Sequence, residues 1–252
     1  ARRRAEMVRL VNTHYDRVLC DFEAVRAIAA GYGFAAATLA TSYIGTADAN
    51  RFACTQPAES FLAEDGSLHL AFLGYMRRDK GFYFLLDTLE SLPAERAARI
   101  RLTVAARRGD ADTMARLARL RPRLAALRHT DGYSHDDLDA LLGDVTLGLV
   151  PVLWNDNLPQ VAMEMHARHI PLLTSDLGGA AELGRNPEFV FAAGDTDALA
   201  GRLEAILAGR LRPGDYWRTA RPPVGPAEHF EDLLHLYGED TTQQTPKKMA
   251  AP

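Results

Sequence analysis

The sequence predicts an α/β fold, a parallel sheet with helices on both faces, preceded by a partial α/β segment. From residue 68 onward, short apolar runs alternate with amphipathic helical segments, and the connections between them are short. This alternation is typical of right-handed βαβ units. The apolar runs are nearly continuous, as expected for strands covered on both faces. Apolar residues make up 47% of the 252 residues, which is sufficient for a sizeable core.

The first part of the chain gives weaker signals. The expected elements are a helix over residues 5–18, a strand over 16–22, a helix over 22–31 and a strand over 37–44. Residues 45–67 are polar and contain Pro57 and Gly66, so we interpret them as a linker.

The alternation after the linker assigns the remaining elements by their periodicity. Strands are expected over residues 68–75, 101–107, 127–132, 145–152, 170–176 and 188–192. Helices are expected over residues 81–92, 111–121, 135–143, 158–169, 178–183 and 195–210. A Pro-rich stretch at 221–223 precedes one more helix over 227–237, and the polar tail 239–252 is expected to be disordered.

Charge and cysteine content exclude several classes of protein. Lys and Arg total 29 against 33 Asp and Glu, so the net charge of −4 excludes a strongly basic, nucleic-acid-coating protein. Cys20 and Cys54 are too few for a disulfide scaffold or a four-cysteine zinc site. We interpret them as a buried small hydrophobe and a loop thiol in a reducing, cytoplasmic compartment.

The ends of the chain also carry information. No apolar run approaches the roughly 18 residues of a membrane helix, and the basic start ARRR has no apolar stretch behind it, so it is no secretory signal. The sequence does not begin with Met. We therefore expect it to be a piece of a longer protein.

Ligands of open parallel sheets bind at the carboxyl ends of the strands, and the first such end is basic. Gly74 leaves the strand, three basic residues follow, and Gly81 precedes a helix. Backbone amides and a cation at that turn would suit a diphosphate. The alternative interpretation is a solvated, charged turn.

Two further strand ends carry unusual residues. Pro159 suits the first turn of a helix, and Glu164 inside that helix needs a defined polar partner, because an unpaired buried carboxylate is costly. Asp156 could act on a ligand or equally cap the helix. Gly178 and Gly179, after the next strand, allow a close backbone approach, although by themselves they equally suit a plain loop.

Taken together and in order, these segments resemble the C-terminal, donor-binding domain of GT-B glycosyltransferases of the retaining family 4 type, also called group 1. The resemblance covers about residues 68–240. Its motifs are FLGYMRRDKGF, similar to a Gly-(x5)-Lys-Gly diphosphate motif, and Asp156-(x7)-Glu164, similar to an E-x7-E motif. SDLGGAAEL, EFVFAAGDTDALAGRLEAIL and the terminal HLYGE follow in the family's order. The resemblance implies a Rossmann-like sheet.

The resemblance also implies roles for individual residues. Lys80 and Asp156 are the expected catalytic residues, with Lys80 on the donor diphosphate and Asp156 near the donor sugar. Glu164 is expected to bind the ribose hydroxyls. The remaining expected contacts to the nucleotide sugar come from the basic turn, the base-side turn and the helix start: Gly74, Tyr75, Arg77, Arg78, Gly132, Tyr133, Asn157, Leu158, Pro159 and Gln160.

Several positions depart from the family pattern. Tyr75 stands where the family usually has Arg, and Arg77 or Arg78 is the candidate for the missing charge. Asp156 is one methylene shorter than the usual Glu, and Ala105-Ala106-Arg107-Arg108-Gly109 replaces a glycine-rich turn. The triplets Asp110-Ala111-Asp112 and Asp195-Thr196-Asp197 stand at helix starts, so we interpret them as caps and expect no metal site.

The resemblance implies a division of the chain. We expect the end of an acceptor-side domain and a linker over 1–60, a nucleotide-sugar-binding domain over 61–224, a crossing helix over 225–240 and a tail over 241–252. The implied function is a retaining, metal-independent glycosyltransferase, or its donor domain. The implied ligands are a nucleotide-diphosphate sugar, with no other cofactor, and a glycan or lipid-linked acceptor.

The implied partner is a missing N-terminal domain or a partner chain. We expect no nucleic acid partner and no transmembrane segment. Peripheral attachment at the inner membrane is an open alternative to a purely cytoplasmic location. Three other functions compete. One is a non-catalytic module that binds a sugar nucleotide or a partner, which Tyr75 and Asp156 favour. The others are a GT-B epimerase or phosphorylase, and a flavodoxin-like signalling domain that would leave Glu164 unexplained.

Overall fold

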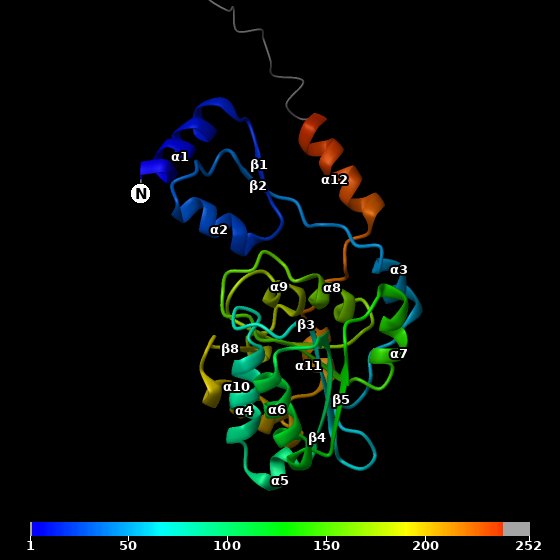
Figure 1. Cartoon of the computed structure of the whole chain (residues 1–252). Helices are drawn as coiled ribbons and strands as arrows, with labels where there is room; N and C mark the ends of the chain where they lie inside the picture. Colours follow the sequence, from blue (N-terminus) through cyan, green and yellow to red (C-terminus); the bar gives the residue numbers. More distant parts are fainter. Residues whose placement is uncertain (1, 239–252) are drawn as a thin grey trace, which may run out of the picture.

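The computed structural model describes residues 2–238, and its largest unit is a six-stranded parallel sheet (Figure 1). The strands are β3 (Leu68–Tyr75), β4 (Ile100–Arg107), β5 (Ala126–Thr130), β6 (Leu147–Val150), β7 (Leu172–Ser175) and β8 (Val190–Phe191). Their order is β5-β4-β3-β6-β7-β8, and every neighbouring pair is parallel. The predicted α/β class is therefore confirmed.

The strand order reverses between β3 and β6. From β3 the chain moves outward through β4 and β5, then returns to β6 and moves outward on the other side. Because parallel crossovers are right-handed, the helices that follow β3 and β4 and those that follow β6 and β7 cover opposite faces. The point of reversal leaves a crevice at the carboxyl ends of the strands, where ligands of such sheets bind.

The helices around this sheet have the following bounds. They are α4 (Phe82–Ser91), α5 (Ala94–Ala97), α6 (Ala111–Leu120), α7 (Leu138–Leu142), α8 (Gln160–His166), α9 (Ala181–Gly184), α10 (Thr196–Leu207) and α11 (Pro213–Trp217). Single 3-10 turns lie at Arg121–Arg123, His135–Asp137 and Pro187–Phe189. The helix predicted over 158–169 is shorter than expected, and α5 and α11 were not predicted.

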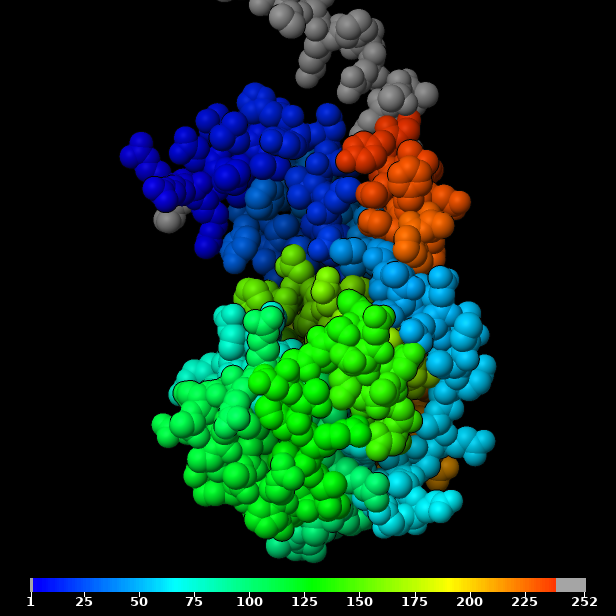
Figure 2. Space-filling model, turned by 45° about the vertical axis from the view of Figure 1, so that its right-hand side comes forward, coloured from blue at the N-terminus to red at the C-terminus, as the bar shows by residue number. Residues whose placement is uncertain are grey.

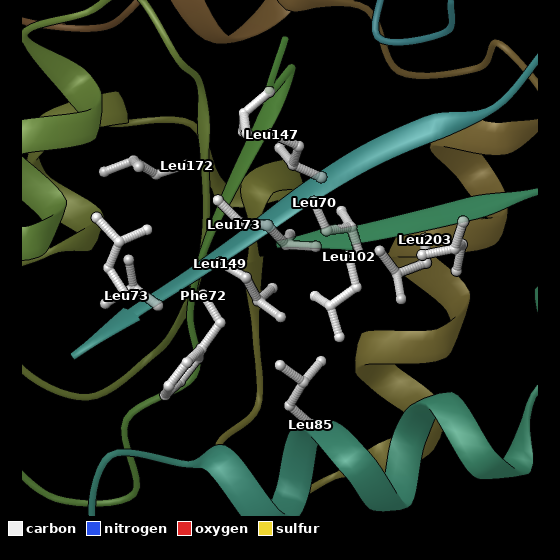
Figure 3. Packing of buried hydrophobic residues seen from close by; sticks show 14 of the residues in the cluster. Leu70, Phe72, Leu73, Leu85, Leu102, Leu147, Leu149, Leu172, Leu173 and Leu203 are labelled. Atoms are coloured by element: carbon white, nitrogen blue, oxygen red, sulfur yellow. The ribbon is translucent and has the colours of Figure 1, made fainter. Parts of the chain in front are cut away.

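Aliphatic side chains fill the space between the sheet and its helices (Figure 3). Leu70 of β3, Leu102 of β4 and Leu149 of β6 are at most 1% exposed. Leu85 of α4 and Leu203 of α10 meet them from one face and are fully buried. The continuous apolar runs in the sequence thus reflect strands that are covered on both sides.

The N-terminal segment is a second, smaller unit (Figure 1). It contains α1 (Arg2–His14), β1 (Val18–Cys20), α2 (Glu23–Gly31) and β2 (Leu39–Thr41), and its two strands pair in parallel. The helix α12 (Pro226–Gly238) returns to this unit, as Figure 2 shows at the upper right. Ser42 Oγ donates a hydrogen bond to Asp232 of α12 at 2.8 Å. These strands are shorter than predicted.

The predicted linker over residues 45–67 contains a helix that the sequence analysis missed, α3 (Ala49–Cys54). Its Phe52 stacks on His169 with a centroid distance of 3.9 Å and lies 5.8 Å from the ring of Trp217. The helix forms because this aromatic contact holds it against the larger unit. Local sequence could not show a partner that lies more than 100 residues away.

The expected burial of Cys20 is confirmed, whereas Cys54, expected to be a loop thiol, lies at the end of a helix. Cys20 is buried in β1, and the exposed Cys54 ends α3; both are free thiols. The tail predicted to be disordered, 239–252, lies outside the described residues.

Candidate functional site

A cavity of about 490 Å³ opens at the carboxyl ends of β3 and β6, at the reversal of the strand order. Its walls come from the ends of β3, β4 and β6, from the turns that follow the strands, and from α8. Ten of the predicted site residues line it: Gly74, Tyr75, Lys80, Gly132, Tyr133, Asp156, Leu158, Pro159, Gln160 and Glu164. Segments that are far apart in the sequence are therefore brought together around one space.

Three predicted site residues do not line the cavity. Arg77 pairs instead with Asp79, with 2.9 Å between its Nε and Oδ1, and Arg78 lies over the ring of Tyr83 at 5.5 Å. Asn157 contributes its carbonyl oxygen to a backbone hydrogen bond from Gly179, 3.0 Å long. The structure thus directs both arginines that were candidates for the missing charge to other partners.

Lys80 is placed by the tight turn that follows β3. Gly81 has a left-handed backbone (φ 73°), and a Cβ at this position would lie 1.7 Å from the carbonyl oxygen of Pro151. Only glycine permits this close approach. The Lys80 ammonium then lies 2.5 Å from Asp156 Oδ2 and 5.2 Å from the centre of the Trp154 ring. An ion pair therefore forms one wall of the cavity.

The other partner in this ion pair, Asp156, is held by its backbone. The amide of Gly179 donates to the Asp156 carbonyl oxygen at 3.1 Å, and a Cβ on Gly178 (φ 77°) would lie 2.0 Å from the same oxygen. The Gly-Gly pair, which in isolation equally suited a plain loop, thus makes the close backbone approach that it allows. Pro159, not Asp156, occupies the N-cap of α8, so the helix-cap interpretation of Asp156 was wrong.

Glu164 is the buried acid of the site, with only 5% of its surface exposed. The hydroxyl of Tyr133 donates to its Oε2 at 3.2 Å, and Nε2 of His135 lies 3.6 Å from its Oε1. The polar partner expected for this carboxylate is thus Tyr133. Burial raises the pKa of the Glu164 carboxyl, and the hydrogen bond from Tyr133 partly opposes that effect.

The pKa of the Tyr133 hydroxyl is shifted as well. Its burial, followed by the neighbouring Glu164 carboxylate, raises the pKa of its hydroxyl well above the usual range. The hydroxyl therefore stays protonated at neutral pH and remains a hydrogen-bond donor to Glu164. This arrangement leaves Oε1 of Glu164, close to His135, as the carboxylate oxygen without that bond.

Besides apolar wall residues, sequence reasoning missed three polar residues that line the cavity: Arg107, Ser134 and His135. Arg107 is the last residue of β4, the neighbour of β3, so its place at a strand end was a usable signal. Ser134 and His135 follow Tyr133 directly, and only their position beside a predicted residue could have indicated them.

The described residues 2–238 contain no group of three or more His, Cys, Asp or Glu side chains that could hold a metal ion. The two acidic triplets are accounted for by the helices that they begin. Asp110 accepts from the amide of Thr113 at 2.8 Å, and Asp195 accepts from the amide of Ala198 at 2.9 Å. Their predicted role as helix caps is confirmed.

The sequence matches the family of glycosyl transferases group 1 over residues 67–209, which is more than half of the chain. The chain belongs to this family. The match spans all six strands of the large sheet and every residue that lines the cavity. The resemblance that the motifs carried is therefore confirmed. A comparison with curated proteins gave no match.

Solved structures of glycosyltransferases share the fold. HepE from Anabaena, crystallised in complex with UDP, superposes with a TM-score of 0.72 at 15% identity, covering 94% of this chain and 67% of HepE. The UDP-forming α,α-trehalose-phosphate synthase of Burkholderia xenovorans gives 0.60 at 20% identity (94% and 62% covered), and sucrose-phosphate synthase of Thermosynechococcus elongatus gives 0.65 at 17% (96% and 62%). These values establish the GT-B fold.

Among the helices of residues 2–238, none combines the length and the apolar character needed to cross a membrane.

Proposed function

We propose that this chain binds a nucleotide-diphosphate sugar and serves as the donor-binding part of a retaining, metal-independent glycosyltransferase. The observation that carries the proposal is the single cavity that brings Lys80, Asp156, Tyr133 and Glu164 together at the strand-order reversal. Each of these groups has a chemistry that suits one portion of such a donor. HepE, which shares the fold, has been crystallised with UDP, UDP-glucose, and UDP together with glucose.

Each of these groups is assigned to a different portion of the donor. Lys80 is the cation for the diphosphate, whose charge grows as the glycosyl bond breaks, so fixing it there favours the transition state. Glu164 is the acceptor for the ribose hydroxyls, because a carboxylate can accept from two vicinal hydroxyls at once. Gly132 and Tyr133 lie on the base side. Asp156, next to Lys80, faces the sugar.

Transfer needs an acceptor site, and we assign that to an N-terminal domain larger than residues 2–41. The support is the small size of the N-terminal unit, whose two paired strands have three residues each. A two-stranded sheet of this length is marginal on its own. The acceptor is a glycan or a lipid-linked sugar, and a complete N-terminal domain would come from the same polypeptide or from a partner chain.

Thermal unfolding in the presence of nucleotides tests donor binding. We expect UDP, GDP or ADP, or the corresponding sugar nucleotides, to raise the melting temperature in a concentration-dependent way. At a fixed nucleotide concentration, Lys80→Ala and Glu164→Ala should strongly reduce the shift, whereas Arg210→Ala, an exposed cation beyond α10, should keep it. If no nucleotide stabilises the wild-type chain, the donor-binding proposal is wrong. That result would favour the alternative of a non-catalytic module that binds a partner.

Turnover is tested separately. Donor hydrolysis or transfer should appear when the chain is supplied with a full N-terminal domain, and Asp156→Ala should abolish it. A chain that binds the donor but neither hydrolyses nor transfers it with that domain present would be a sugar-nucleotide-binding module without catalysis.

A further inference from the structure

The cavity contains a cation that the proposed function does not use. Arg107 lines its wall at the end of β4. Within residues 2–238, no carboxylate lies within 4 Å of its guanidinium and no side-chain hydrogen bond involves it. An arginine carries five N–H donors and is always charged. Such a group, facing a cavity and lacking a protein acceptor, is available to an anionic ligand.

The sheet places this arginine beside the diphosphate turn. Arg107 and Tyr75 are direct partners in the parallel register of β4 and β3. Paired residues on adjacent strands point to the same face and lie within about 5 Å of each other. Tyr75 ends its strand without a charge, five residues before Lys80. The positive charge at this level of the sheet therefore comes from β4.

The neighbouring turn leaves room for the arginine. Gly132 has a left-handed backbone (φ 77°), and a Cβ at this position would lie 3.7 Å from Cγ of Arg107. The aliphatic stem of Arg107 thus packs beside the glycine on the base side of the cavity. Arg107 lines the cavity and is also exposed to solvent.

Two side chains that line the cavity, Lys80 and Arg107, carry a permanent positive charge. Its charged or titratable side chains other than tyrosine are Lys80, Arg107, His135, Asp156 and Glu164. Lys80 is paired with Asp156, so Arg107 is the permanently charged cation of the cavity wall that has no carboxylate partner among the described residues. Arg77 and Arg78 have other partners. A nucleoside diphosphate would bring at least two further negative charges into this balance.

We propose that Arg107 is a second phosphate-binding residue of the donor site, acting with Lys80 on the phosphate groups of the nucleotide. The inference rests on the proposed donor-binding function and adds to it a residue that the diphosphate motif does not contain. A planar guanidinium can donate two parallel hydrogen bonds to one phosphate group, whereas the ammonium of Lys80 acts as a point charge. The competing role for the same side chain is a contact to the base or the ribose.

Affinity for a nucleotide and for its parts distinguishes these roles. Binding of UDP, UMP and uridine, or of the ADP or GDP series if one of these stabilises the wild-type chain best, is measured by calorimetry for the wild type and for Arg107→Ala. We expect the variant to bind the diphosphate about 10- to 100-fold more weakly and the nucleoside equally well. Arg107→Lys should restore part of the loss.

Arg108→Ala is the matched control. Arg108 follows Arg107, is exposed and does not line the cavity, and its contact to Asp131 uses the backbone amide rather than the side chain. This variant should bind UDP as the wild type does. A second readout is salt: affinity for UDP should depend less on ionic strength in Arg107→Ala than in the wild type, because one phosphate contact is lost.

The outcomes separate the two proposals. Equal weakening of UDP, UMP and uridine by Arg107→Ala would assign the arginine to the nucleoside and overturn the phosphate role. Unchanged UDP affinity in a variant that melts like the wild type would overturn it as well, while leaving donor binding intact. Absence of binding by the wild-type chain would instead remove the proposed function on which the inference rests.

Discussion

The Lys80 ammonium lies 2.5 Å from Oδ2 of Asp156, so the cation assigned to the donor diphosphate is bound to a carboxylate before any nucleotide arrives. Both side chains are partly buried, with 26% and 13% of their surface exposed, which weakens solvent screening of the pair. A diphosphate entering the cavity must compete with Asp156 for Lys80 or share it. Asp156 therefore influences both donor affinity and the position of Lys80.

Asp156→Asn should accordingly strengthen the binding of UDP. Removing the competing charge frees Lys80 for the phosphates, and the gain should be up to about fivefold, the value of an ion pair that is still partly solvated. Lys80→Ala should instead weaken the binding of UDP by about tenfold. Calorimetric titration of UDP measures both. Weaker binding by Asp156→Asn would mean that Asp156 assists the diphosphate instead of competing with it.

Glu164→Gln should stabilise the nucleotide-free chain at neutral pH. Burial raises the pKa of this carboxyl in the folded state, so ionising it costs more there than in the unfolded chain. Its contribution to stability is full below the unfolded pKa and is lost as the pH rises through the folded one. In urea unfolding, the free energy of unfolding of the variant should exceed that of the wild type at pH 7.5. The difference should disappear near pH 4.5.

The same variant should lose donor affinity, because glutamine keeps one acceptor oxygen but not the charge. A loss of about tenfold for UDP is expected from one charge-assisted hydrogen bond. Glu188→Gln, an exposed acid outside the cavity, is the control and should change neither property. A variant that is less stable than the wild type at every pH would show that Glu164 serves mainly to hold the fold together.

Gly81→Ala should destabilise the chain and weaken nucleotide binding together. The added methyl would meet the Pro151 carbonyl oxygen at 1.7 Å in a left-handed turn, so the turn that presents Lys80 must move. We expect a loss of at least about 1 kcal/mol in thermal or urea unfolding. Gly201→Ala, inside α10 with nothing within 4 Å, should instead stabilise by about 0.5–1 kcal/mol. Equal effects of the two substitutions would contradict the close approach at Gly81.

The parts of the site that could be predicted from the sequence are those that lie at strand ends or within motifs of fixed spacing. Gly74, Lys80 and Glu164 belong to contiguous motifs, and parallel strands bring their carboxyl ends to one edge, so these residues do meet at one cavity. The same rule selects Arg107, the last residue of β4, but no family motif covers residues 105–109. A motif identifies what matches and does not show what replaces a missing residue.

The pairing of side chains could not be predicted, because it depends on register. Arg77 pairs with Asp79 within its own turn, whereas Lys80 pairs with Asp156 after another strand, and the sequence does not show which basic residue takes which partner. The helix α3 was missed for a related reason. Its six residues are too few to form a stable helix alone, and Phe52 finds its aromatic partners only in the folded chain.

His166 should make stability fall as the pH drops below neutral. It is fully buried in α8; its Nε2 donates to the carbonyl oxygen of Arg221 at 2.7 Å, and its Nδ1 accepts from Tyr216 at 2.9 Å. Burial lowers the pKa of this imidazole to about 4, so the folded chain keeps it neutral while the unfolded chain protonates it near pH 6.5. The stability is present above pH 6.5 and is lost toward pH 4.

The double difference between wild type and His166→Gln isolates this effect. Between pH 7 and pH 5, the free energy of unfolding measured in urea should fall by about 2 kcal/mol more for the wild type than for the variant. His69 and His169, whose pKa values are also lowered by burial, titrate in both proteins and cancel. An equal pH dependence in the two proteins would mean that the buried imidazole is not held neutral.

Glu182→Ala should loosen the N-terminal unit without unfolding the larger one. Oε1 of Glu182 accepts from the amide of Ala24 at 2.6 Å, and Oε2 accepts from that of Glu23 at 3.1 Å, so a side chain of α9 caps α2 across the boundary between the units. The N-cap residue of α2, Phe22, supplies no side-chain cap of its own. Loss of a helix cap costs about 1 kcal/mol.

Hydrogen exchange measures this loosening. Amides of residues 18–44 should exchange about fivefold faster in Glu182→Ala, whereas those of β3 and β6 should keep the wild-type rate, because opening is local to the unit that lost its cap. Glu188→Ala, exposed in the turn that follows α9, should leave all of these rates unchanged. Faster exchange in β3 and β6 as well would show that the two units open together, with Phe22, which packs against Gly179, as the shared contact.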